Sequence, residues 1–298
     1  MKVRIGVGLG TQGLAEPETT FAPMVDALER CRFDSLWLSE RLTAPAPDPV
    51  VGLAFAAART TKLKLGFSVL VLPGRSPVVL AKELATLDVL SNGRLLPAFG
   101  LGVADPREQQ AFGVERGARA AWFDEALPLL RRLWTEDTVD HHGDRFRYEG
   151  LQVLPKPLQQ PPDVWLGGRA PSELQRVGRF GDGWLPSFCT PDDVAHGRPE
   201  IERIAAEHDR TIDPEHFGAL VPYAVDGIPD ALGAFLARRR PDVQVTDVVA
   251  GGIADLPPLL ERFTEAGASK FVVVPIGEPE RWDDHLAEVA EAVKPLET

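Results

Sequence analysis

The sequence is short of cysteine and of long hydrophobic runs, and each shortage excludes a class of protein. Its only cysteines, Cys31 and Cys189, are too few for the dense disulfide framework of a small secreted domain, so we expect a reducing, cytoplasmic location. No apolar run approaches the ~20 residues that a membrane-spanning helix needs. The first residues reach Gly6 before a signal-peptide core can form. We therefore expect no membrane partner.

Basic residues are outnumbered as well. The chain has 32 Lys and Arg against 44 Asp and Glu, which gives a formal net charge of -12. A surface of that sign repels a nucleic-acid backbone unless a local basic patch intervenes, so we expect no nucleic-acid partner. The rest of the composition, with 44% hydrophobic and 26% charged residues, is that of an ordinary globular protein.

What the sequence does contain is a regular alternation of short β-branched or apolar runs with longer stretches of helical period. This pattern is typical of repeated βα units around a parallel sheet, and eight units match a (β/α)8 TIM barrel. We expect one domain over residues 1–298. The expected barrel strands are Val3–Gly8, Ser35–Leu38, Leu63–Val71, Leu95–Gly100, Val164–Gly167, Gly183–Leu185, Phe217–Val221 and Lys270–Pro275.

The helix between strands three and four has the clearest local signals. Ser76 can cap it, Pro77 suits its first position, and Asn92-Gly93 can end it in a left-handed turn, which predicts a helix over Pro77–Leu90. Apolar residues spaced by three and four form one stripe that should pack on the barrel. These residues include Val79, Leu80, Leu84, Leu87 and Leu90.

The segment after strand four is too long to be a simple βα loop. Residues 101–163 predict a loop, a helix near Arg119–Trp134 and a hairpin around Gly143–Val153. Only part of this insertion is the fourth barrel helix, and the rest should cover the mouth of the barrel.

A second insertion follows strand seven. Residues 224–255 predict a short helix, Pro229–Arg239, and then an apolar run, Val243–Val249. That run could be an extra strand, because apolar runs of this length do not by themselves distinguish strand from helix.

Glycines stand at the C-terminal ends of several predicted strands, which is where the active sites of such barrels lie. Gly8 and Gly10 end strand one, and Gly100 and Gly102 follow strand four. Because glycine has no Cβ, the backbone at these positions could approach a flat ligand closely. Each pair could equally be a plain tight turn.

A candidate phosphate seat follows strand five. Gly167, Gly168 and Arg169 come just before a predicted helix start, and glycine-turn N–H groups, a helix N-terminus and an arginine together favour a bound phosphate. A plain tight turn is the alternative. Arg75, after strand three, could also pair with an anionic ligand. Trp184, in strand six, could either wall a cofactor pocket or be structural.

Two adjacent charges end strand two. The Glu40 carboxylate and the Arg41 guanidinium could make polar contacts with a substrate, and these two residues are the candidate catalytic residues. A simple ion pair at the rim would explain them equally well.

Three common catalytic arrangements are missing. None of the six histidines follows a predicted strand in a metal-ligand pattern, no strand-end lysine is placed to form a Schiff base, and no Gly-x-Ser-x-Gly elbow occurs. We therefore expect no metal site and disfavour a metallohydrolase, an aldolase and a Ser-His-Asp hydrolase. A site in which a cofactor performs the chemistry is the simpler interpretation.

Several blocks of the sequence, in chain order, resemble the bacterial luciferase-like monooxygenase superfamily of flavin and deazaflavin barrels. The resemblance covers residues 1–190 well, and the C-terminal third only through Glu265-Ala266-Gly267. Within the superfamily the chain is most similar to the actinobacterial oxidoreductases that use coenzyme F420, a deazaflavin. The blocks are Phe67–Pro73, Ala81–Asp88, Leu90–Arg94, Leu133-Trp134, Pro155-Lys156-Pro157, Gly167-Gly168 and Gly181–Trp184.

The resemblance implies that coenzyme F420 is the cofactor, with FMN as the alternative. It also implies a non-proline cis peptide at Ser68-Val69 on which the cofactor ring rests, a ring lined by Gly100 to Val103, and a phosphate received by Gly167 and Gly168. The expected cofactor-binding residues are Gly8, Ser68, Val69, Gly100, Gly102, Gly167, Gly168, Arg169 and Trp184.

The sequence departs from the sugar-phosphate reductases of this superfamily. Those members carry a His at the end of strand two and a Glu after strand four, where this chain has Glu40-Arg41 and Val103-Ala104. Many members also have a His where this chain has Ser76. We therefore do not expect oxidation of glucose 6-phosphate.

The expected function is hydride transfer between coenzyme F420 and an unidentified small organic substrate. The alternatives are an FMN-dependent monooxygenase that uses reduced flavin and O2, and a flavin-binding protein without turnover. The resemblance also implies a homodimer that pairs through helices two and three.

Overall fold

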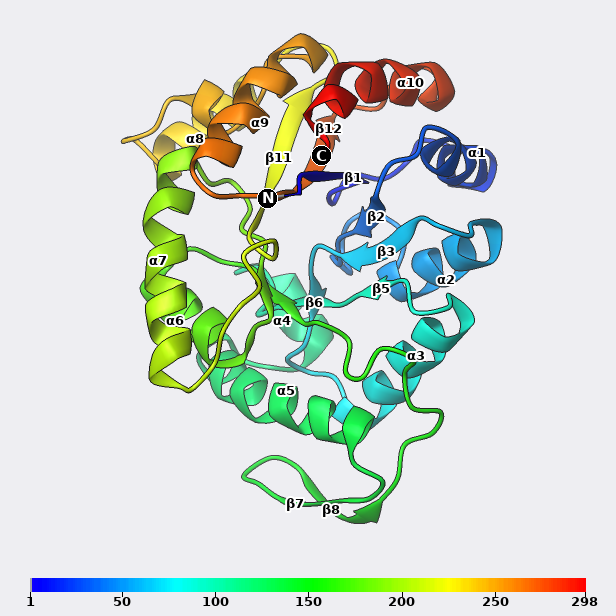
Figure 1. Ribbon diagram of the computed structural model, residues 1–298, viewed down its shortest axis with the longest axis vertical. Coiled ribbons are helices and arrows are strands. Elements are labelled where there is room, and N and C mark those ends of the chain that lie inside the picture. The colour runs from blue at the N-terminus through cyan, green and yellow to red at the C-terminus, as the bar shows by residue number, and fades with distance from the viewer. Residues whose placement is uncertain (1) are drawn as a thin grey trace.

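Ten short parallel strands form the centre of the molecule in the computed structural model, which describes residues 2–298 (Figure 1). Six of them pair in the order β11-β12-β1-β2-β3-β5, and four in the order β10-β9-β6-β4. Their bounds are Arg4–Gly8 (β1), Ser35–Leu38 (β2), Lys64–Phe67 (β3), Leu70–Val71 (β4), Leu95–Leu96 (β5), Ala98–Gly100 (β6), Trp165–Leu166 (β9), Gly183–Trp184 (β10), Gly218–Ala224 (β11) and Lys270–Ile276 (β12).

The two sheets join into one ring. Parallel bridges from Trp184 to Phe217 and from Ser187 to Leu220 link the end of the second sheet to the first. On the opposite side, β3 and β5 continue along the chain into β4 and β6. Eight strand positions thus follow one another around a barrel, which confirms the predicted (β/α)8 fold class.

Strands three and four of the prediction are each divided in two. Strand three is interrupted at Ser68-Val69, where the peptide bond is cis as the resemblance implies, and its two parts pair with different neighbours. Strand four is interrupted at Pro97, because proline has no N–H to continue the ladder. The two divisions are the places where one sheet passes into the other.

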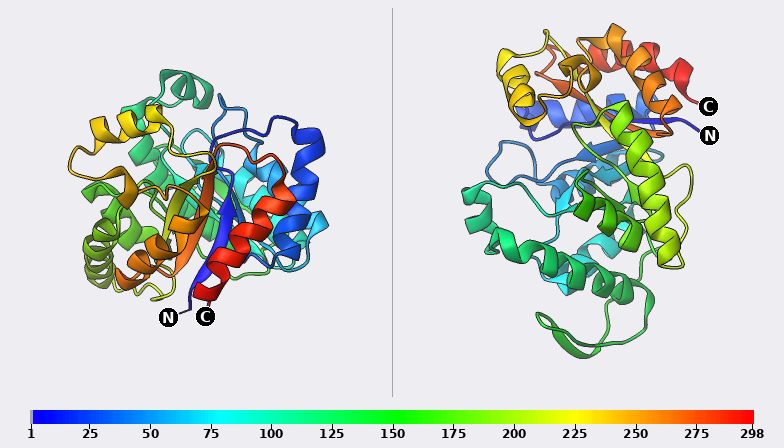
Figure 2. Two further views of the ribbon diagram at one scale, coloured as in Figure 1. Left: turned by 90° about the horizontal axis from the view of Figure 1, so that it is seen from above. Right: turned by 90° about the vertical axis from the view of Figure 1, so that its left-hand side faces the viewer.

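Helices cover the outside of the ring (Figures 1 and 2). Several begin at a proline behind a capping side chain; for example, the Asp48 carboxylate accepts a hydrogen bond from the Val51 N–H at 2.9 Å. None of the helices in residues 2–298 is long and apolar enough to cross a membrane. The barrel helices are Pro17–Arg30 (α1), Pro49–Arg59 (α2), Pro77–Leu90 (α3), Arg119–Thr135 (α5), Pro171–Phe180 (α6), Pro191–Glu207 (α7), Leu256–Glu265 (α9) and Trp282–Val293 (α10).

Helix α3 has the predicted bounds and caps. The Ser76 hydroxyl accepts from the Val79 N–H, and the positive φ angles of Asn92 (59°) and Gly93 (73°) end the helix in a left-handed turn. The expected apolar stripe is correct for the three buried leucines but wrong for Val79 and Leu90, which are 56% and 75% exposed. Val79 lies about 100° around the helix from its buried neighbour Leu80, so its side chain points away from the barrel.

The insertion after β6 contains both predicted elements, but the hairpin does not cover the mouth. Strands Val139–His142 (β7) and Arg147–Leu151 (β8) pack along the outer side of α5, where the Phe146 and Trp122 rings are 5.4 Å apart. Figure 1 shows the hairpin beyond α5, away from the ring of strands. Near the cavity the insertion instead places the start of the short helix α4 (Pro106–Phe112), whose capping residue Asp105 pairs with the cavity residue Arg41.

The apolar run after β11 is not an extra strand. The helix α8 (Asp230–Arg239) is followed by a short 3-10 helix, Val245–Asp247, and by buried Val248 and Val249. These two valines pack with Leu236 of α8 in a small separate core. The run is therefore apolar because it supports α8, not because it joins the barrel.

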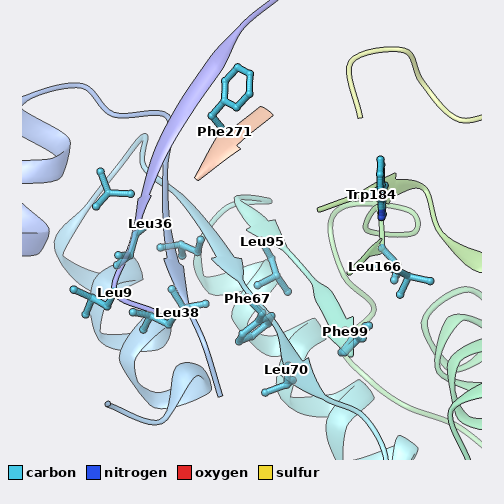
Figure 3. Close-up of a cluster of buried hydrophobic side chains, with 14 of the residues drawn as sticks. Leu9, Leu36, Leu38, Phe67, Leu70, Leu95, Phe99, Leu166, Trp184 and Phe271 are labelled. Atoms are coloured by element: carbon cyan, nitrogen blue, oxygen red, sulfur yellow. The ribbon is translucent and has the colours of Figure 1, made fainter. Parts of the chain in front are cut away.

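The barrel interior is filled below the mouth. Trp37 lies inside the ring with no exposed surface, and Gly6 and Gly66 on the neighbouring strands make room for it, because a Cβ on Gly66 would lie 2.3 Å from the Trp37 ring. A larger core fills the space between strands and helices. Its members labelled in Figure 3 are Leu9, Leu36, Leu38, Phe67, Leu70, Leu95, Phe99, Leu166, Trp184 and Phe271.

The two ends of the chain lie side by side at the N-terminal end of the barrel strands (Figure 2). The Ile5 N–H donates to the Glu297 carboxylate at 3.0 Å, and the Val3 N–H donates to the Thr298 hydroxyl at 3.1 Å. The first strand is thereby tied to the last residues.

Candidate functional site

A cavity of about 660 Å³ opens at the C-terminal end of the barrel. Its volume lies in the range of small-molecule and cofactor sites. Every strand position of the ring contributes residues to its lining, and helices α5, α6 and α8 contribute the rest. Active sites of (β/α)8 enzymes lie at this end of the barrel.

The Ser68-Val69 turn and two glycine strand ends form part of the cavity wall. A Cβ on Gly100 would lie 2.5 Å from Val69 Cγ2, and one on Gly167 would lie 3.7 Å from Val69 Cγ1. Gly102 also lines the cavity, with a φ angle of +80°. The lack of a side chain at Gly100 makes room for the Val69 side chain, so that Val69 packs directly against the end of β6 in the cavity wall.

Gly8 has a different place from the one expected. Among the residues of the strand-one end, Gly10 and Gln12 line the cavity and Gly8 does not. A Cβ on Gly8 would lie 2.9 Å from Val272 Cγ1 in the barrel interior. Gly8 therefore serves the packing of the barrel rather than the wall of the cavity.

The end of β2 holds the Ser68-Val69 turn in place. The Ser39 hydroxyl donates to the Ser68 carbonyl at 2.8 Å, and the Glu40 N–H donates to the Val69 carbonyl at 3.0 Å. One oxygen of the Glu40 carboxylate accepts the Val71 N–H at 2.7 Å. The turn is thus bound on both sides by strand-two residues.

Glu40 and Arg41 do not pair with each other. The Glu40 carboxylate accepts a hydrogen bond from Arg75, and burial raises the pKa of Glu40 although the Arg75 charge opposes the shift. The sequence suggested that Arg75 could pair with an anionic ligand. Its guanidinium instead pairs with Glu40, so it is not a free partner for such a ligand. Arg41 pairs with Asp105 at 3.2 Å, and hydrogen bonds from Arg107 lower the pKa of Asp105 to about 2.

The predicted phosphate seat already contains a carboxylate. Glu173, on the first turn of α6, accepts the backbone N–H groups of Arg169 and Ala170, each at 2.8 Å. Gly167 and Gly168 line the cavity, but Arg169 does not. Its guanidinium faces a separate cavity of about 440 Å³, where it lies 3.8 Å from the Asp193 carboxylate.

Trp184 does not wall the cavity. Its ring lies against α7, where a Cβ on Gly197 would approach it to 2.5 Å, and its indole Nε1 donates to the Gly168 carbonyl at 2.8 Å. Trp184 thus acts on the site indirectly, by holding Gly168, and otherwise belongs to the core between strands and helices.

Several cavity residues were not found from the sequence. Phe123 and Arg176 line the wall from α5 and α6, and Phe188 and Phe235, whose rings are 6.2 Å apart, line the mouth. Phe188 follows strand six closely, and its position after a strand end could have indicated it. The other three lie on helices, where no local pattern shows which residues turn toward the barrel axis.

Acid-base groups free of protein partners are scarce in this wall. Its charged residues Glu40, Arg41, Glu173 and Arg176 each have a hydrogen-bonded protein partner. Within residues 2–298, no group of three or more His, Cys, Asp or Glu is arranged to hold a metal ion. The arrangement suits the binding and orientation of a cofactor and a substrate.

Comparison with known proteins agrees with this geometry. A model of the luciferase-like monooxygenase family matches residues 2–238, most of the chain. The chain belongs to this family. Among relatives of the luciferase-like chain, a protein of Mycobacterium tuberculosis without an assigned function is 31% identical over 211 residues, 70% of this chain and 68% of the relative.

Another luciferase-like relative is the F420-dependent glucose-6-phosphate dehydrogenase of Amycolatopsis mediterranei. It is 30% identical over 210 residues, which are 62% of this chain and 61% of that protein. The match thus spans about three fifths of the relative. The relatives include F420-dependent enzymes, and the luciferase-like chain is itself an oxidoreductase.

Two solved structures share the luciferase-like barrel. An F420-dependent secondary alcohol dehydrogenase in complex with an F420-acetone adduct superposes with a TM-score of 0.83 at 20% identity, over 100% of both chains. A monooxygenase from Streptomyces bottropensis superposes with a TM-score of 0.81 at 21% identity, over 98% of this chain and 99% of that one. At these identities the likeness shows the fold alone.

Proposed function

We propose that this oxidoreductase transfers hydride between coenzyme F420 and a small organic substrate in the cavity at the mouth of the barrel. The observation that carries the proposal is the wall formed by Val69 and the glycines Gly100, Gly102, Gly167 and Gly168. These residues line a cavity of about 660 Å³, a volume that suits a flat ring system. The F420-dependent relatives support the choice of cofactor.

The residues present fit such a cofactor. Val69 presents a branched apolar side chain at the centre of the glycine-lined wall, and Phe123 and Leu101 extend the apolar surface. A ring of apolar side chains excludes water from a bound flavin or deazaflavin. When bound, the deazaflavin supplies the hydride chemistry at its central ring carbon.

The chain itself contributes orientation. Ser39 and Glu40 fix the Ser68-Val69 turn, so the surface against which the ring rests keeps one shape. Arg41 lines the cavity with one guanidinium nitrogen on Asp105, and its Nε has no hydrogen-bond partner within residues 2–298. We assign Arg41 the task of donating a hydrogen bond to a substrate oxygen.

Oxidation of glucose 6-phosphate is not part of the proposal. The positions at which the sugar-phosphate reductases carry acid-base residues hold Glu40-Arg41 and Val103-Ala104 in this chain. Glu40 is engaged by Arg75 and Val71, and the side chains of Val103 and Ala104 cannot transfer a proton. A different substrate is therefore expected.

An FMN-dependent monooxygenase that uses reduced flavin and O2 is the second candidate. The family model itself and the solved Streptomyces bottropensis structure favour it, since both carry the monooxygenase name. FMN and F420 have ring systems of the same shape, so the glycine-lined wall suits either. A flavin-binding protein without turnover is the remaining alternative, because each charged side chain of the wall has a protein partner.

The test is a pair of equilibrium titrations of the purified protein, with F420 and with FMN, followed by ligand fluorescence. We expect F420 to bind at least about tenfold more tightly than FMN, a difference of about 1.4 kcal/mol. Absence of F420 binding contradicts the proposal, and a reversed order favours the monooxygenase. Stopped-flow mixing of reduced F420 with carbonyl, alkene and quinone acceptors then tests turnover.

A further inference from the structure

We infer that Arg176, and not Arg169 or the backbone N–H groups of Arg169 and Ala170, binds the phosphate of the cofactor tail. The inference rests on the proposed function, because it assumes a phosphorylated flavin or deazaflavin in the main cavity. Three features of α6 and of the turn before it carry it: backbone N–H groups occupied by Glu173, an arginine that faces away from the cavity, and a guanidinium nitrogen without a hydrogen-bond acceptor among residues 2–298.

The turn before α6 already holds a carboxylate. The Glu173 carboxylate accepts the N–H groups of Arg169 and Ala170, each at 2.8 Å, so these donors are not available to a second anion. A Cβ on Gly168 would lie 2.5 Å from the Glu173 carboxyl carbon, which shows how closely the carboxylate fills this corner. Phosphate would have to displace a negative charge from its own hydrogen bonds to bind there.

Arg169 is turned away from the cavity. Its guanidinium lies 3.8 Å from Asp193, which also pairs with Arg240 at 2.9 Å. The residues around it line the separate cavity between α6, α7 and the segment after α8. The arginine that follows the glycine turn in the sequence is therefore not the arginine that faces the ligand.

Arg176 faces the main cavity from the second turn of α6. Its side chain is only 12% exposed; Nε donates to the Asp124 carboxylate at 2.7 Å, and the guanidinium carbon lies 5.5 Å from the centre of the Phe123 ring. Nη1 donates to the Ser172 carbonyl at 3.5 Å, and Nη2 has no hydrogen-bond acceptor among residues 2–298. Arg176 lines the same cavity as Gly167 and Gly168.

These contacts leave Nη2 of a fixed guanidinium for an anion. Asp124 holds one edge and Phe123 covers one face, so the side chain is already ordered and little conformational entropy is lost on binding. The fork of the guanidinium matches phosphate oxygens in geometry and charge. Because the site is partly closed to water, the attraction is stronger than at an exposed arginine.

The experiment compares ligands with and without the phosphate, among which FMN and riboflavin differ in the phosphate alone. Wild-type protein, Arg176→Gln and the control Arg169→Gln are titrated with FMN and riboflavin, and with F420 and its phosphate-free deazaflavin chromophore. We expect Arg176→Gln to weaken F420 and FMN binding at least about tenfold and to leave both phosphate-free ligands within about twofold. Arg169→Gln should change none of the four dissociation constants by more than about twofold.

Further variants distinguish the effect of the Arg176 charge on binding from an effect of the substitution on folding. Asp124→Asn keeps the Arg176 charge but weakens its ion pair, so it should preserve or tighten F420 binding, whereas a structural role of the pair predicts a loss. Arg176→Lys should restore part of the affinity. Circular dichroism and thermal unfolding verify that each variant is folded.

Two results overturn the inference while leaving the proposed function intact. One is an equal loss of phosphate-bearing and phosphate-free ligands in Arg176→Gln, and the other is a phosphate-specific loss in Arg169→Gln instead. If wild-type protein binds neither F420 nor FMN, the proposed function fails and the inference fails with it.

Discussion

Glu40 and Arg75 form an ion pair beside the Ser68-Val69 turn, and the Glu40 side chain in it is only 1% exposed. The pair joins the end of β2 to the segment that follows β4. The same carboxylate accepts the Val71 N–H, so two donors depend on one buried acceptor. Removing one partner of such a buried ion pair destabilises the fold, because the other charge then stays buried without a counter-charge.

The first prediction concerns that pair. Glu40→Ala should lower the free energy of unfolding by about 3 kcal/mol, the typical cost of breaking a buried pair. Glu136→Ala, which removes the half-exposed partner of Arg132, should change it little. Urea denaturation of both variants measures the difference, and equal losses in the two would show that the buried pair contributes no more stability than the exposed one.

The second prediction concerns the glycine wall. Gly100→Ala places a methyl group 2.5 Å from Val69 Cγ2, so the valine side chain must move into the space that the ring should occupy. We expect F420 affinity to fall at least about tenfold, which is about 1.4 kcal/mol. Gly117→Ala is the matched control, because no atom lies within 4 Å of its added Cβ. If both variants bind F420 like the wild type, the ring does not lie against this wall.

The third prediction concerns the two thiols. Cys189 is buried, and desolvation raises its pKa to about 12, so it stays neutral and unreactive from neutral pH to pH 10. Cys31 is partly exposed. A chromogenic disulfide reagent at pH 8 should therefore titrate one thiol in the native protein, two in denaturant, and none in native Cys31→Ser. Reaction of Cys189 in the folded protein would show that its segment opens.

The fourth prediction concerns the homodimer, which the structure leaves as a proposal. Three apolar side chains, Val51 and Phe55 of α2 and Val79 of α3, are 69%, 45% and 56% exposed on the helices expected to pair. Such exposed residues suit an interface with a second copy. Sedimentation velocity should show a dimer for the wild type and a monomer for a Val51→Asp, Val79→Asp double variant.

A control for that experiment is Leu42→Asp, since Leu42 is 48% exposed in the loop beside α4 and not on α2 or α3. It should sediment like the wild type. A monomeric wild type at micromolar concentration would refute the proposed pairing.

The order of elements could be predicted from the sequence because local physics determines it. The bounds of α3 follow from a capping serine, a first-turn proline and an Asn-Gly end, all of which act within a few residues. The strand positions follow from apolar runs. The glycines at the ends of strands four and five, and the Ser68-Val69 turn implied by the resemblance, all line the cavity, while their binding of a cofactor stays a prediction.

Side-chain directions could not be predicted in the same way. Whether Arg169 or Arg176 faces the cavity depends on how α6 is rotated against α5 and α7, and that rotation is set by packing across the whole outer layer. Likewise, the hairpin after α5 was predicted as an element, but its position depends on contacts such as Trp122 with Phe146. Tertiary contacts determine the side-chain directions and the position of the hairpin, and no local sequence pattern indicates these contacts.

The hydrogen bond from the Ile5 N–H to the Glu297 carboxylate helps to hold both ends of the polypeptide together on the face opposite the cavity. An affinity tag or a fluorescent fusion partner attached at either end would therefore leave the ligand entrance clear. The same closeness makes the chain a candidate for circular permutation, with a short linker across the old ends and new ends opened in the exposed hairpin turn at Asp144. Such a permutant would keep the barrel while moving a fusion site to the outer layer.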